Sequence, residues 1–320
     1  MPRSTVCIVG GTGFVGRHLA ARLVENDFNV KILTRSRARH RELLVLPTLS
    51  LVEANVHDLE TLKREFSGCH ALVNLVGILN ERGHRGQGFA QVHVELTGKI
   101  LAACASAGVA RLLHMSALNA GENAPSHYLR SKGEAAALVL KAQGLLQVSV
   151  FEPSVIFGPG DSFFNLFAAL LRMAPGIFPL ACPRAKFAPV YVGDVADAFV
   201  RSLDEHASFG RRFSLCGPKI YTLRELVCYT AKVMELQRAI IGLPRPLSWL
   251  QAAIMEWLPG KPFSLDNYRS LKIDSVCSRN DFGSFAIAPL ALEAVVPAYL
   301  GKLTPQAELQ RLRRMHGLNL

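Results

Sequence analysis

The stretch TVCIVGGTGFVG, residues 5–16, sets a strand, a glycine-rich turn and the start of a helix in direct succession. Residues 5–9 are apolar and mostly β-branched, which is typical of a strand buried on both faces of a sheet. Residues 14–25 repeat apolar side chains at helical spacing. Gly10, Gly13 and Gly16 separate the two patterns, so the chain turns where no side chain obstructs it. This succession predicts the opening of a parallel β-α-β unit.

The three glycines also predict what the turn binds. The first permits the tight turn, the second lets a ligand approach the backbone, and the third lets the helix pack closely on its strand. The helix N-terminus offers free N–H groups and the positive end of its dipole to an anion. We therefore expect the pyrophosphate of a nicotinamide dinucleotide on this turn, held by Gly10, Thr12, Gly13, Phe14, Val15 and Gly16. The alternative is a glycine-rich turn without a ligand.

Hydrophobic runs continue to alternate with helical patterns through the first half of the chain. We expect further strands at residues 29–34, 49–54, 71–76, 112–115 and 148–152, and long helices at 89–107 and 128–143. Apolar strands that alternate with helices predict an α/β fold with a doubly wound parallel sheet of the Rossmann type.

After Pro153, prolines and glycines cluster and divide the chain into short pieces. We expect residues 1–155 to form an NAD(P)-binding Rossmann domain and residues 156–320 to form a smaller, mostly C-terminal lobe on the substrate side. Residues 187–202 are expected to return to the first domain, with Asp194 capping the first turn of a helix. Further helices are expected at residues 223–235, 246–258 and 305–316.

The composition narrows the class of protein. Of the 320 residues, 50% are hydrophobic and 19% are charged, which predicts a sizeable packed core. The apolar runs are too short to span a bilayer and no secretory signal is present, so a cytoplasmic location is expected. The net charge of +11 favours phosphorylated ligands or anionic lipid, whereas the lack of a basic stripe interleaved with aromatic residues argues against nucleic acid.

The seven cysteines include no CxxC pair. Their odd number and their spacing argue against a disulfide framework and against a structural metal site. Most lie in apolar runs, where we expect them to pack as small core residues.

The residues that end the second predicted strand favour NADP(H) over NAD(H). An acidic side chain there would bind the ribose 2′-hydroxyl and repel a 2′-phosphate. The sequence has Thr34 followed by Arg35, and no carboxylate before Glu42. Arg35 can contact a phosphate through a bidentate, charge-assisted pair, and Arg17 is placed to assist. The alternative is a solvated basic loop.

Tyr128 and Lys132 suggest chemistry beside the cofactor. Four residues apart at the start of a predicted helix, they share one face. An ammonium beside a phenol lowers the pKa of the phenol, which then exchanges a proton with a substrate oxygen during hydride transfer. Ser116, at the end of the preceding strand, is placed to polarise the same oxygen. Alone, a Tyr and a Lys at this spacing are usually a pair on the surface; the upstream dinucleotide turn and the serine at the strand end favour catalysis.

With these motifs the chain resembles the extended short-chain dehydrogenase/reductases. More specifically, the segment MSALNAGENAPSHYLRSK after residue 114 and the run EWLPGK at 256–261 resemble the atypical branch that contains the NADPH-binding accessory subunit of respiratory complex I and its bacterial relatives. The resemblance implies further cofactor contacts at Asn55 and Val56 beside the adenine, at Leu75, Val76 and Gly77, and at Tyr128, Lys132 and Pro153.

The chain departs from that family at three points, the mildest of which is Asn55 at the position of an acidic residue in the adenine pocket. His93 stands where the superfamily usually has asparagine, which puts the usual proton relay in doubt; a histidine there can still touch the cofactor or hold a water. The alternative is a satisfied histidine on a helix face. Only twelve positions separate Ser116 from Tyr128, which argues against a nucleotide-sugar substrate.

Two functions fit these residues. The first is a cofactor-binding protein tied to respiratory or quinone metabolism, with a respiratory-complex or quinone-related partner, holding NADPH with little or no turnover. It would lie peripheral to the inner face of a membrane. The second is a working NADP-dependent reductase, dehydrogenase or epimerase that acts on a small hydrophobic carbonyl or hydroxyl substrate by Tyr- and Lys-assisted hydride transfer.

One helix bears on both functions. Its apolar residues fall on one side at helical spacing: Leu247, Leu250, Ile254, Trp257 and Leu258. Packing in the core of the lobe is the first expectation. Contact with a membrane surface through Trp249 and Trp257, or with a quinone-like ligand, is the alternative.

Overall fold

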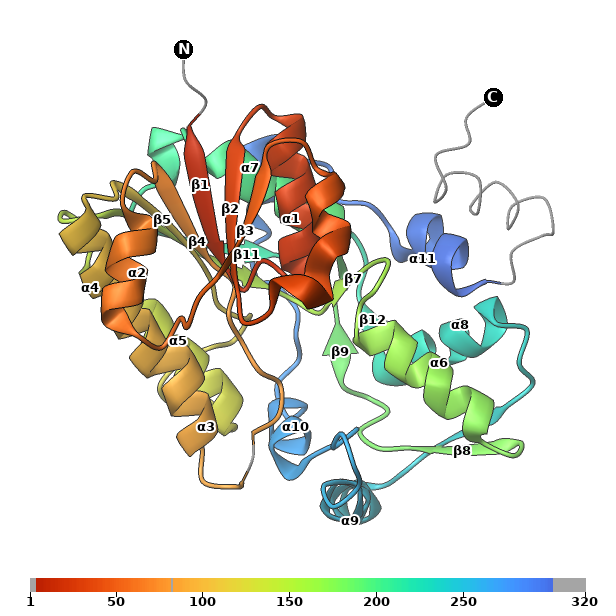
Figure 1. The fold of residues 1–320 in the computed structure, drawn as a ribbon. Helices are drawn as coiled ribbons and strands as arrows, with labels where there is room; N and C mark the ends of the chain where they lie inside the picture. Colours follow the sequence, from red (N-terminus) through yellow and green to blue (C-terminus); the bar gives the residue numbers. More distant parts are fainter. Residues whose placement is uncertain (1–3, 82, 302–320) are drawn as a thin grey trace, which may run out of the picture.

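The central feature of the computed structural model, which describes residues 4–81 and 83–301, is a seven-stranded sheet (Figure 1). Its order is β11-β6-β5-β4-β1-β2-β3, and all neighbouring strands in it are parallel. The strands are β1 (Thr5–Val9), β2 (Asn29–Thr34), β3 (Leu49–Glu53), β4 (Ala71–Asn74), β5 (Arg111–Met115), β6 (Gln147–Pro153) and β11 (Arg211–Leu215). The predicted doubly wound parallel sheet is confirmed.

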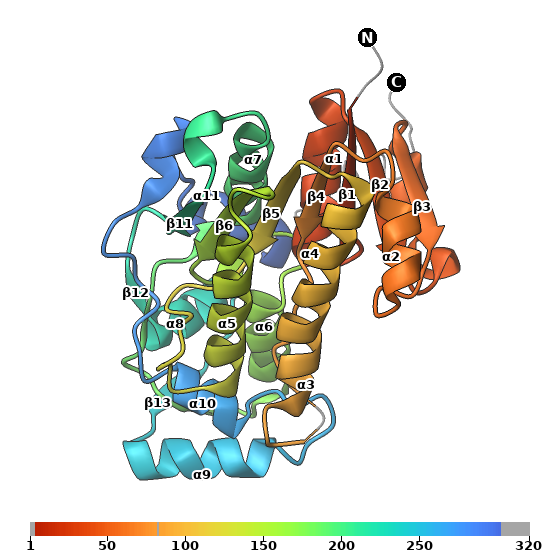
Figure 2. The same cartoon turned by 90° about the vertical axis from the view of Figure 1, so that its left-hand side faces the viewer.

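Helices cover both faces of this sheet (Figures 1 and 2). On one face lie α1 (Phe14–Glu25) and α7 (Val192–Ser202), and on the other lie α2 (Leu59–Phe66), α4 (Leu96–Ala107) and α5 (His127–Lys141). Leu19, Leu23 and Phe199 pack into the first core, and Leu62, Phe66 and Ile100 into the second. Burial of the sheet on both faces explains why its central strands are continuous apolar runs.

The seventh strand, β11, was not predicted. It lies at the edge of the sheet, where it pairs with β6 alone. Its first two residues, Arg211 and Arg212, are exposed, while Phe213 and Leu215 are buried. An edge strand tolerates such charges, so it lacks the apolar run that marks the central strands.

The remaining elements form a lobe beside the carboxyl ends of the strands (Figure 1). Its core is separate from the two cores of the sheet and includes Phe157, Phe164, Leu226 and Val296. The elements of this part are β7 (Ile156–Phe157), α6 (Phe163–Met173), β8 (Ile177–Leu180), β9 (Lys186–Phe187), β10 (Val190–Tyr191), β12 (Tyr221–Thr222), α8 (Leu223–Val233), β13 (Ala239–Gly242), α9 (Arg245–Met255), α10 (Leu265–Ser270) and α11 (Leu292–Leu300).

Short helical turns complete the described chain. They are η1 (Arg37–Val45), α3 (Gln87–Phe89), η2 (Ala90–Glu95), η3 (His206–Ser208) and η4 (Asp281–Phe285). The helix expected at residues 305–316 lies outside the described residues. Of the helices that the structure describes, none combines the length and the apolar character needed to cross a bilayer.

Asp194 does not cap its helix. The N-cap of α7 is Tyr191, and the Asp194 carboxylate instead accepts the backbone N–H of Leu290, with an N···O distance of 2.7 Å. Burial raises the pKa of Asp194 to about 6. This carboxylate therefore joins α7 to a distant segment of the chain, which no local pattern reveals.

The expectation against disulfides is also wrong. Cys216 and Cys277, 61 positions apart in sequence, form a disulfide that ties the end of β11 to the chain before η4. Cys7, Cys69 and Cys104 are buried as expected, but Cys228 is exposed. Spacing along the chain did not predict the pair because it forms between segments that only the fold brings together.

The expected core packing of the apolar side of α9 is wrong as well. Leu247, Leu250, Ile254, Trp257 and Leu258 are between 45% and 84% exposed. The buried residues of this helix are the small Ser248 and Ala252. Periodicity identified the apolar side of the helix, but it does not reveal whether that side faces the protein.

Candidate functional site

The glycine turn has the shape that a phosphate cradle requires. Gly10 has φ +85°, and a Cβ there would lie 3.0 Å from the backbone of Leu75 and Val76. A Cβ on Gly16 would lie 2.5 Å from Cα of Gly11, so this glycine lets α1 pack against the turn. Gly13, the N-cap of α1, provides no side chain to cap the helix. The N–H groups of the first turn are therefore available to an anionic ligand.

A cavity of about 610 Å³ runs along the carboxyl ends of β1, β2 and β4 beside this turn. Seven of the predicted cofactor residues line it: Gly10, Thr12, Arg35, Asn55, Val56, Val76 and Gly77. Phe14, Val15 and Gly16 lie in the first turn of α1 beside it, with Gly13 as the N-cap. Leu75 packs against the core, and Pro153 is buried at the end of β6. The dimensions and the glycine cradle fit a dinucleotide.

Basic side chains gather at the end of this cavity nearest β2. Arg35 and Arg39 both line it, and within the described residues no ion pair joins either one to a carboxylate. Arg17 is held differently: its guanidinium lies 2.7 Å from Glu42 and also donates to the carbonyl of Thr12. Glu42 is therefore turned away from the cavity, paired with Arg17.

Several lining residues were not predicted as site residues, among them Ser36, Arg39, His40 and His57. Arg39 and His40 lie on η1, whose short turns bring them back over the end of β2. The local concentration of basic residues at 35–41 was the available signal, but only a turn can place Arg35 and Arg39 at the same cavity.

Tyr128 and Lys132 lie on α5, close to the other end of the cavity. Lys132 Nζ donates to the carbonyl of Met115 at 2.7 Å, and it lies 3.4 Å from where a Cβ on Gly77 would be. Ser116 Oγ donates to the carbonyl of Lys132 at 3.2 Å. The structure thus brings Ser116, Tyr128 and Lys132 to one region.

The expected lowering of the Tyr128 pKa by Lys132 is wrong. Burial raises the pKa of Tyr128 to about 12, and it lowers the pKa of Lys132 to about 8. The ammonium of Lys132 is directed to a backbone carbonyl, and desolvation dominates both groups. At neutral pH Tyr128 is therefore a protonated phenol.

His93 is buried on the π-helical turn η2 with both ring nitrogens engaged. Its Nε2 accepts the backbone N–H of Ile78 at 3.1 Å, so Nδ1 carries the proton and donates to Ser131 Oγ at 2.8 Å. Burial, followed by the charge of Lys132, lowers the His93 pKa to about 3. This histidine is a neutral bridge between the loop after β4 and α5, so the satisfied-histidine alternative describes it best.

Beside Tyr128 opens a second cavity, of about 470 Å³, which is largely apolar. Its wall includes Tyr128 and a set of aromatic and aliphatic side chains from the lobe: Phe163, Leu166, Phe167, Leu170, Phe178, Leu180, Phe187, Met255, Phe263 and Leu271. Leu79 belongs to this wall, while its neighbour Ile78 lines the cavity at the glycine turn. Neighbouring residues of the loop after β4 therefore contribute to the walls of both cavities.

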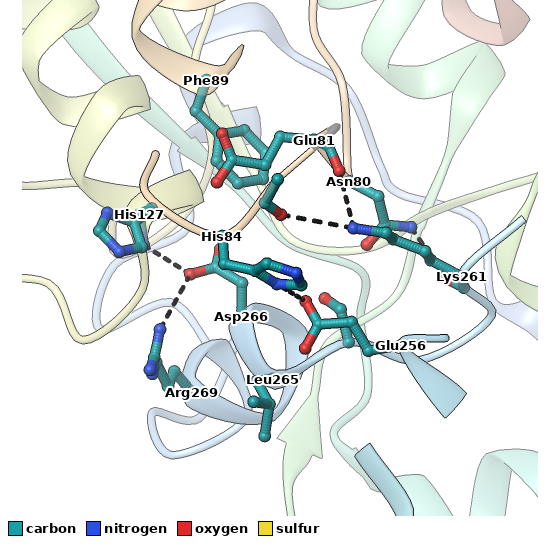
Figure 3. A pocket seen from close by; sticks show the side chains of 12 residues that line it. Asn80, Glu81, His84, Phe89, His127, Glu256, Lys261, Leu265, Asp266 and Arg269 are labelled. Atoms are coloured by element: carbon teal, nitrogen blue, oxygen red, sulfur yellow. Dashed lines mark hydrogen bonds and ion pairs between the residues drawn. The ribbon is translucent and has the colours of Figure 1, made fainter. Parts of the chain in front are cut away.

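Polar contacts join the loop after β4 to the lobe next to these cavities (Figure 3). Lys261 Nζ donates to the carbonyl of Glu81 at 3.0 Å, and His84 Nδ1 lies 2.9 Å from Glu256 Oε1. The carboxylate of Asp266 accepts the backbone N–H groups of His127 and Tyr128 at 2.8 and 3.0 Å. These contacts surround a space of only about 50 Å³, so they hold the lobe against α5 and leave no room for a substrate.

Comparison with known proteins agrees with this geometry. The model of the NAD dependent epimerase/dehydratase family matches residues 6–216. The mitochondrial NADH dehydrogenase [ubiquinone] 1 alpha subcomplex subunit 9 of Arabidopsis thaliana is 28% identical over 289 residues, 85% of this chain and 71% of the relative. A ceramide reductase of Caulobacter vibrioides is 28% identical over 249 residues, 76% of this chain and 75% of the relative.

The fold is also that of solved structures. The structure of MoeE5 in complex with UDP-glucuronic acid and NAD superposes with a TM-score of 0.73 over 97% of this chain and 99% of its own, at 18% identity. At that identity the likeness shows the fold alone. The glycine cradle, the adjoining cavity and the family match together show that the chain belongs to the NAD dependent epimerase/dehydratase family, within which it is related to the subunit 9 proteins, and that it binds a nicotinamide dinucleotide.

Proposed function

We propose that the chain is an NADP(H)-dependent reductase of a hydrophobic carbonyl compound. The observation that carries the proposal is the position of Tyr128 in the wall of the apolar cavity, to which Leu79 contributes while the preceding residue, Ile78, lines the dinucleotide cavity. A substrate carbonyl in the first cavity would lie next to a nicotinamide in the second. We also propose the expected division into a Rossmann domain and a substrate-side lobe, with β11 added to the former.

The preference for NADP(H) rests on Arg35 and Arg39. A 2′-phosphate at the end of β2 would meet two guanidinium groups and no carboxylate from the cavity wall. Ser36 supplies a further hydroxyl in the same wall. NAD(H), which lacks that phosphate, would leave both cations without an anionic partner.

The proton needed for reduction would come from Tyr128. The reduced nicotinamide, when bound, supplies a hydride to the carbonyl carbon. The carbonyl oxygen would then take the proton of the Tyr128 hydroxyl, and solvent would later return a proton to the tyrosine. The ketone thus gains one hydride and one proton and becomes an alcohol. Because the pKa of Tyr128 is raised to about 12, the phenol is protonated at neutral pH and has a proton to donate. Lys132 would hold the nicotinamide ribose, and Ser116 would help to orient the carbonyl.

The name of one relative supports this direction of reaction. The related Caulobacter protein is called a ceramide reductase, which names both a reduction and a hydrophobic substrate. The wall of the apolar cavity would suit a substrate of the same chemical kind.

A second candidate function is a cofactor-holding subunit with no turnover, tied to respiratory or quinone metabolism. The polar groups of Ser116 and Lys132 are both bonded to backbone carbonyls, which favours a role in holding the structure. The relation to the subunit 9 proteins of NADH dehydrogenase points to the same role. A cytoplasmic location, peripheral to the inner face of a membrane, stays a prediction under both candidates.

Turnover separates the two candidates. The purified chain is mixed with NADPH and a panel of long-chain ketones and quinones, and NADPH oxidation is followed by absorbance. The reductase predicts that Tyr128→Phe loses turnover but still binds NADPH. Tyr268→Phe, which changes a tyrosine outside the wall of either cavity, is the matched control. Full activity in Tyr128→Phe overturns the proposed mechanism. NADPH binding without any turnover favours the second candidate.

A further inference from the structure

One surface of the lobe is apolar although it is exposed. On α9, Leu247, Trp249, Leu250 and Ile254 are between 45% and 59% exposed, and Trp257 just beyond the helix is 84% exposed. In Figure 2 this helix lies along the outer edge of the lobe, next to β13. We call these five side chains the α9 face. An exposed apolar helix side that carries tryptophan and leucine can bury itself in a membrane interface.

The same helix forms part of the wall of the apolar cavity. Gln251 and Met255 line that cavity, whereas the α9 face points away from it. Whatever covers the α9 face is therefore separated by one helix from the space that ends at Tyr128. An apolar molecule that entered beside α9 from the side of the α9 face would reach the apolar cavity and, at its end, Tyr128.

The charged residues of the segments around the α9 face indicate an anionic partner. Residues 162–184 and 236–255, which carry α6, β8, β13 and α9, contain no aspartate or glutamate. They contain four arginines instead, of which Arg172, Arg184 and Arg245 are exposed. The carboxylate that follows, Glu256, is buried against His84. Exposed arginines on segments that include the tryptophan-bearing helix and contain no carboxylate match an anionic bilayer surface.

Exposed apolar side chains continue beyond the helix. Ile241 on β13 and Ile177 on β8 are 50% and 59% exposed, and these two strands pair with each other. Leu243, which follows β13, donates its backbone N–H to Leu180, and Ser248 of α9 bonds the backbone of Leu243 and Cys182. The strand pair is thus hydrogen-bonded to the start of α9.

We propose that the α9 face docks on an anionic lipid bilayer and that the substrate is a membrane lipid whose hydrocarbon chain enters the apolar cavity beside α9. The second half of this inference rests on the proposed reductase function; the first half does not. Tryptophan side chains would lie at the headgroup level, and Arg184 and Arg245 would contact lipid phosphates.

The chain carries its own probe for the test. It contains two tryptophans, Trp249 and Trp257, and both belong to the α9 face. The full chain is mixed with vesicles of phosphatidylcholine and phosphatidylglycerol, with pure phosphatidylcholine vesicles as the comparison. With the anionic vesicles we expect a blue shift of the tryptophan emission and its quenching by brominated acyl chains. Arg184→Gln/Arg245→Gln should partition about 30-fold more weakly. The vesicles are then sedimented. If the tryptophan emission is unchanged and the protein stays in the supernatant with both vesicle types, the proposal is overturned and a protein becomes the expected partner of the α9 face.

Matched variants separate docking from catalysis. Leu250→Gln/Ile254→Gln is expected to lose vesicle binding, whereas Leu145→Gln, which removes a leucine that is 92% exposed and follows α5, keeps it. Circular dichroism verifies that both variants fold. Reduction of a short soluble ketone should be unaffected by the α9 variant, and reduction of a long-chain ketone presented in vesicles should fall. If the protein binds vesicles but shows no turnover, the proposed reductase function is contradicted and the docking on the bilayer is not. If the α9 variant and the wild type reduce the vesicle-borne ketone equally well, the proposed entry of a membrane lipid beside α9 is contradicted.

Discussion

Replacement of Arg35 by alanine should weaken NADPH binding while leaving NADH binding unchanged. Arg35 lines the dinucleotide cavity without a carboxylate partner among the described residues. A charge-assisted hydrogen bond contributes about 1.5–3 kcal/mol, and the lower half of that range applies because Arg35 is exposed to solvent. About 1.5–2 kcal/mol corresponds to roughly a 10- to 30-fold rise in the Kd for NADPH. Arg39, in the same wall, keeps the loss from being complete.

The assay is calorimetric titration with NADPH and, separately, with NADH. Arg37→Ala is the matched control, because it removes the same charge from the same loop at a residue that does not line the cavity. The reasoning is refuted if Arg35→Ala binds NADPH within twofold of wild type, or if it loses affinity equally for both nucleotides. If Arg35→Ala and Arg37→Ala raise the Kd for NADPH equally, the loss of affinity comes from the change in net charge alone.

Three further outcomes follow from the geometry. Burial lowers the pKa of Lys132 to about 8, so its ammonium is present below that pH and lost above it. Since this ammonium is proposed to hold the nicotinamide ribose, the affinity for NADPH should fall between pH 7 and 9.5. Lys132→Met, titrated over the same range, should show no such fall. Gly16→Ala places a Cβ 2.5 Å from Gly11 and should lower the free energy of unfolding by about 3 kcal/mol in urea, whereas Gly98→Ala, with open space around it, should raise it by about 0.5–1 kcal/mol. Asp266→Ala should cost about 1–2 kcal/mol by removing the acceptor of two N–H groups at the start of α5, and an unchanged melting temperature would argue against that role.

The sequence predicts best what is encoded locally. Strands β1 and β2 and helix α1 have the predicted bounds, because an apolar run, a glycine turn and a helical repeat follow one another without interruption. The dinucleotide cavity was predicted for the same reason, since its residues come from the ends of successive strands.

Features formed between distant segments escaped the prediction. The edge strand β11 carries arginines, the disulfide joins Cys216 to Cys277, and Asp266 caps a helix more than a hundred positions earlier in sequence. The apolar cavity combines α6, β8, α9 and the loop after β4, none of which resembles a binding motif on its own. The direction of the Tyr128 pKa shift also depended on burial, which spacing along the helix does not reveal.

The most direct test of the central claim is dinucleotide binding at the glycine turn. Gly13 has a φ of −74°, and a Cβ there would meet only the carbonyl of Gly10, at 3.3 Å, so Gly13→Asp should fold with little change in melting temperature. Its carboxylate would stand at the helix N-terminus, where the pyrophosphate is expected. We predict that wild type binds one equivalent of NADPH by calorimetric titration and that Gly13→Asp binds none detectably. A folded Gly13→Asp variant that binds NADPH with wild-type affinity would contradict the account.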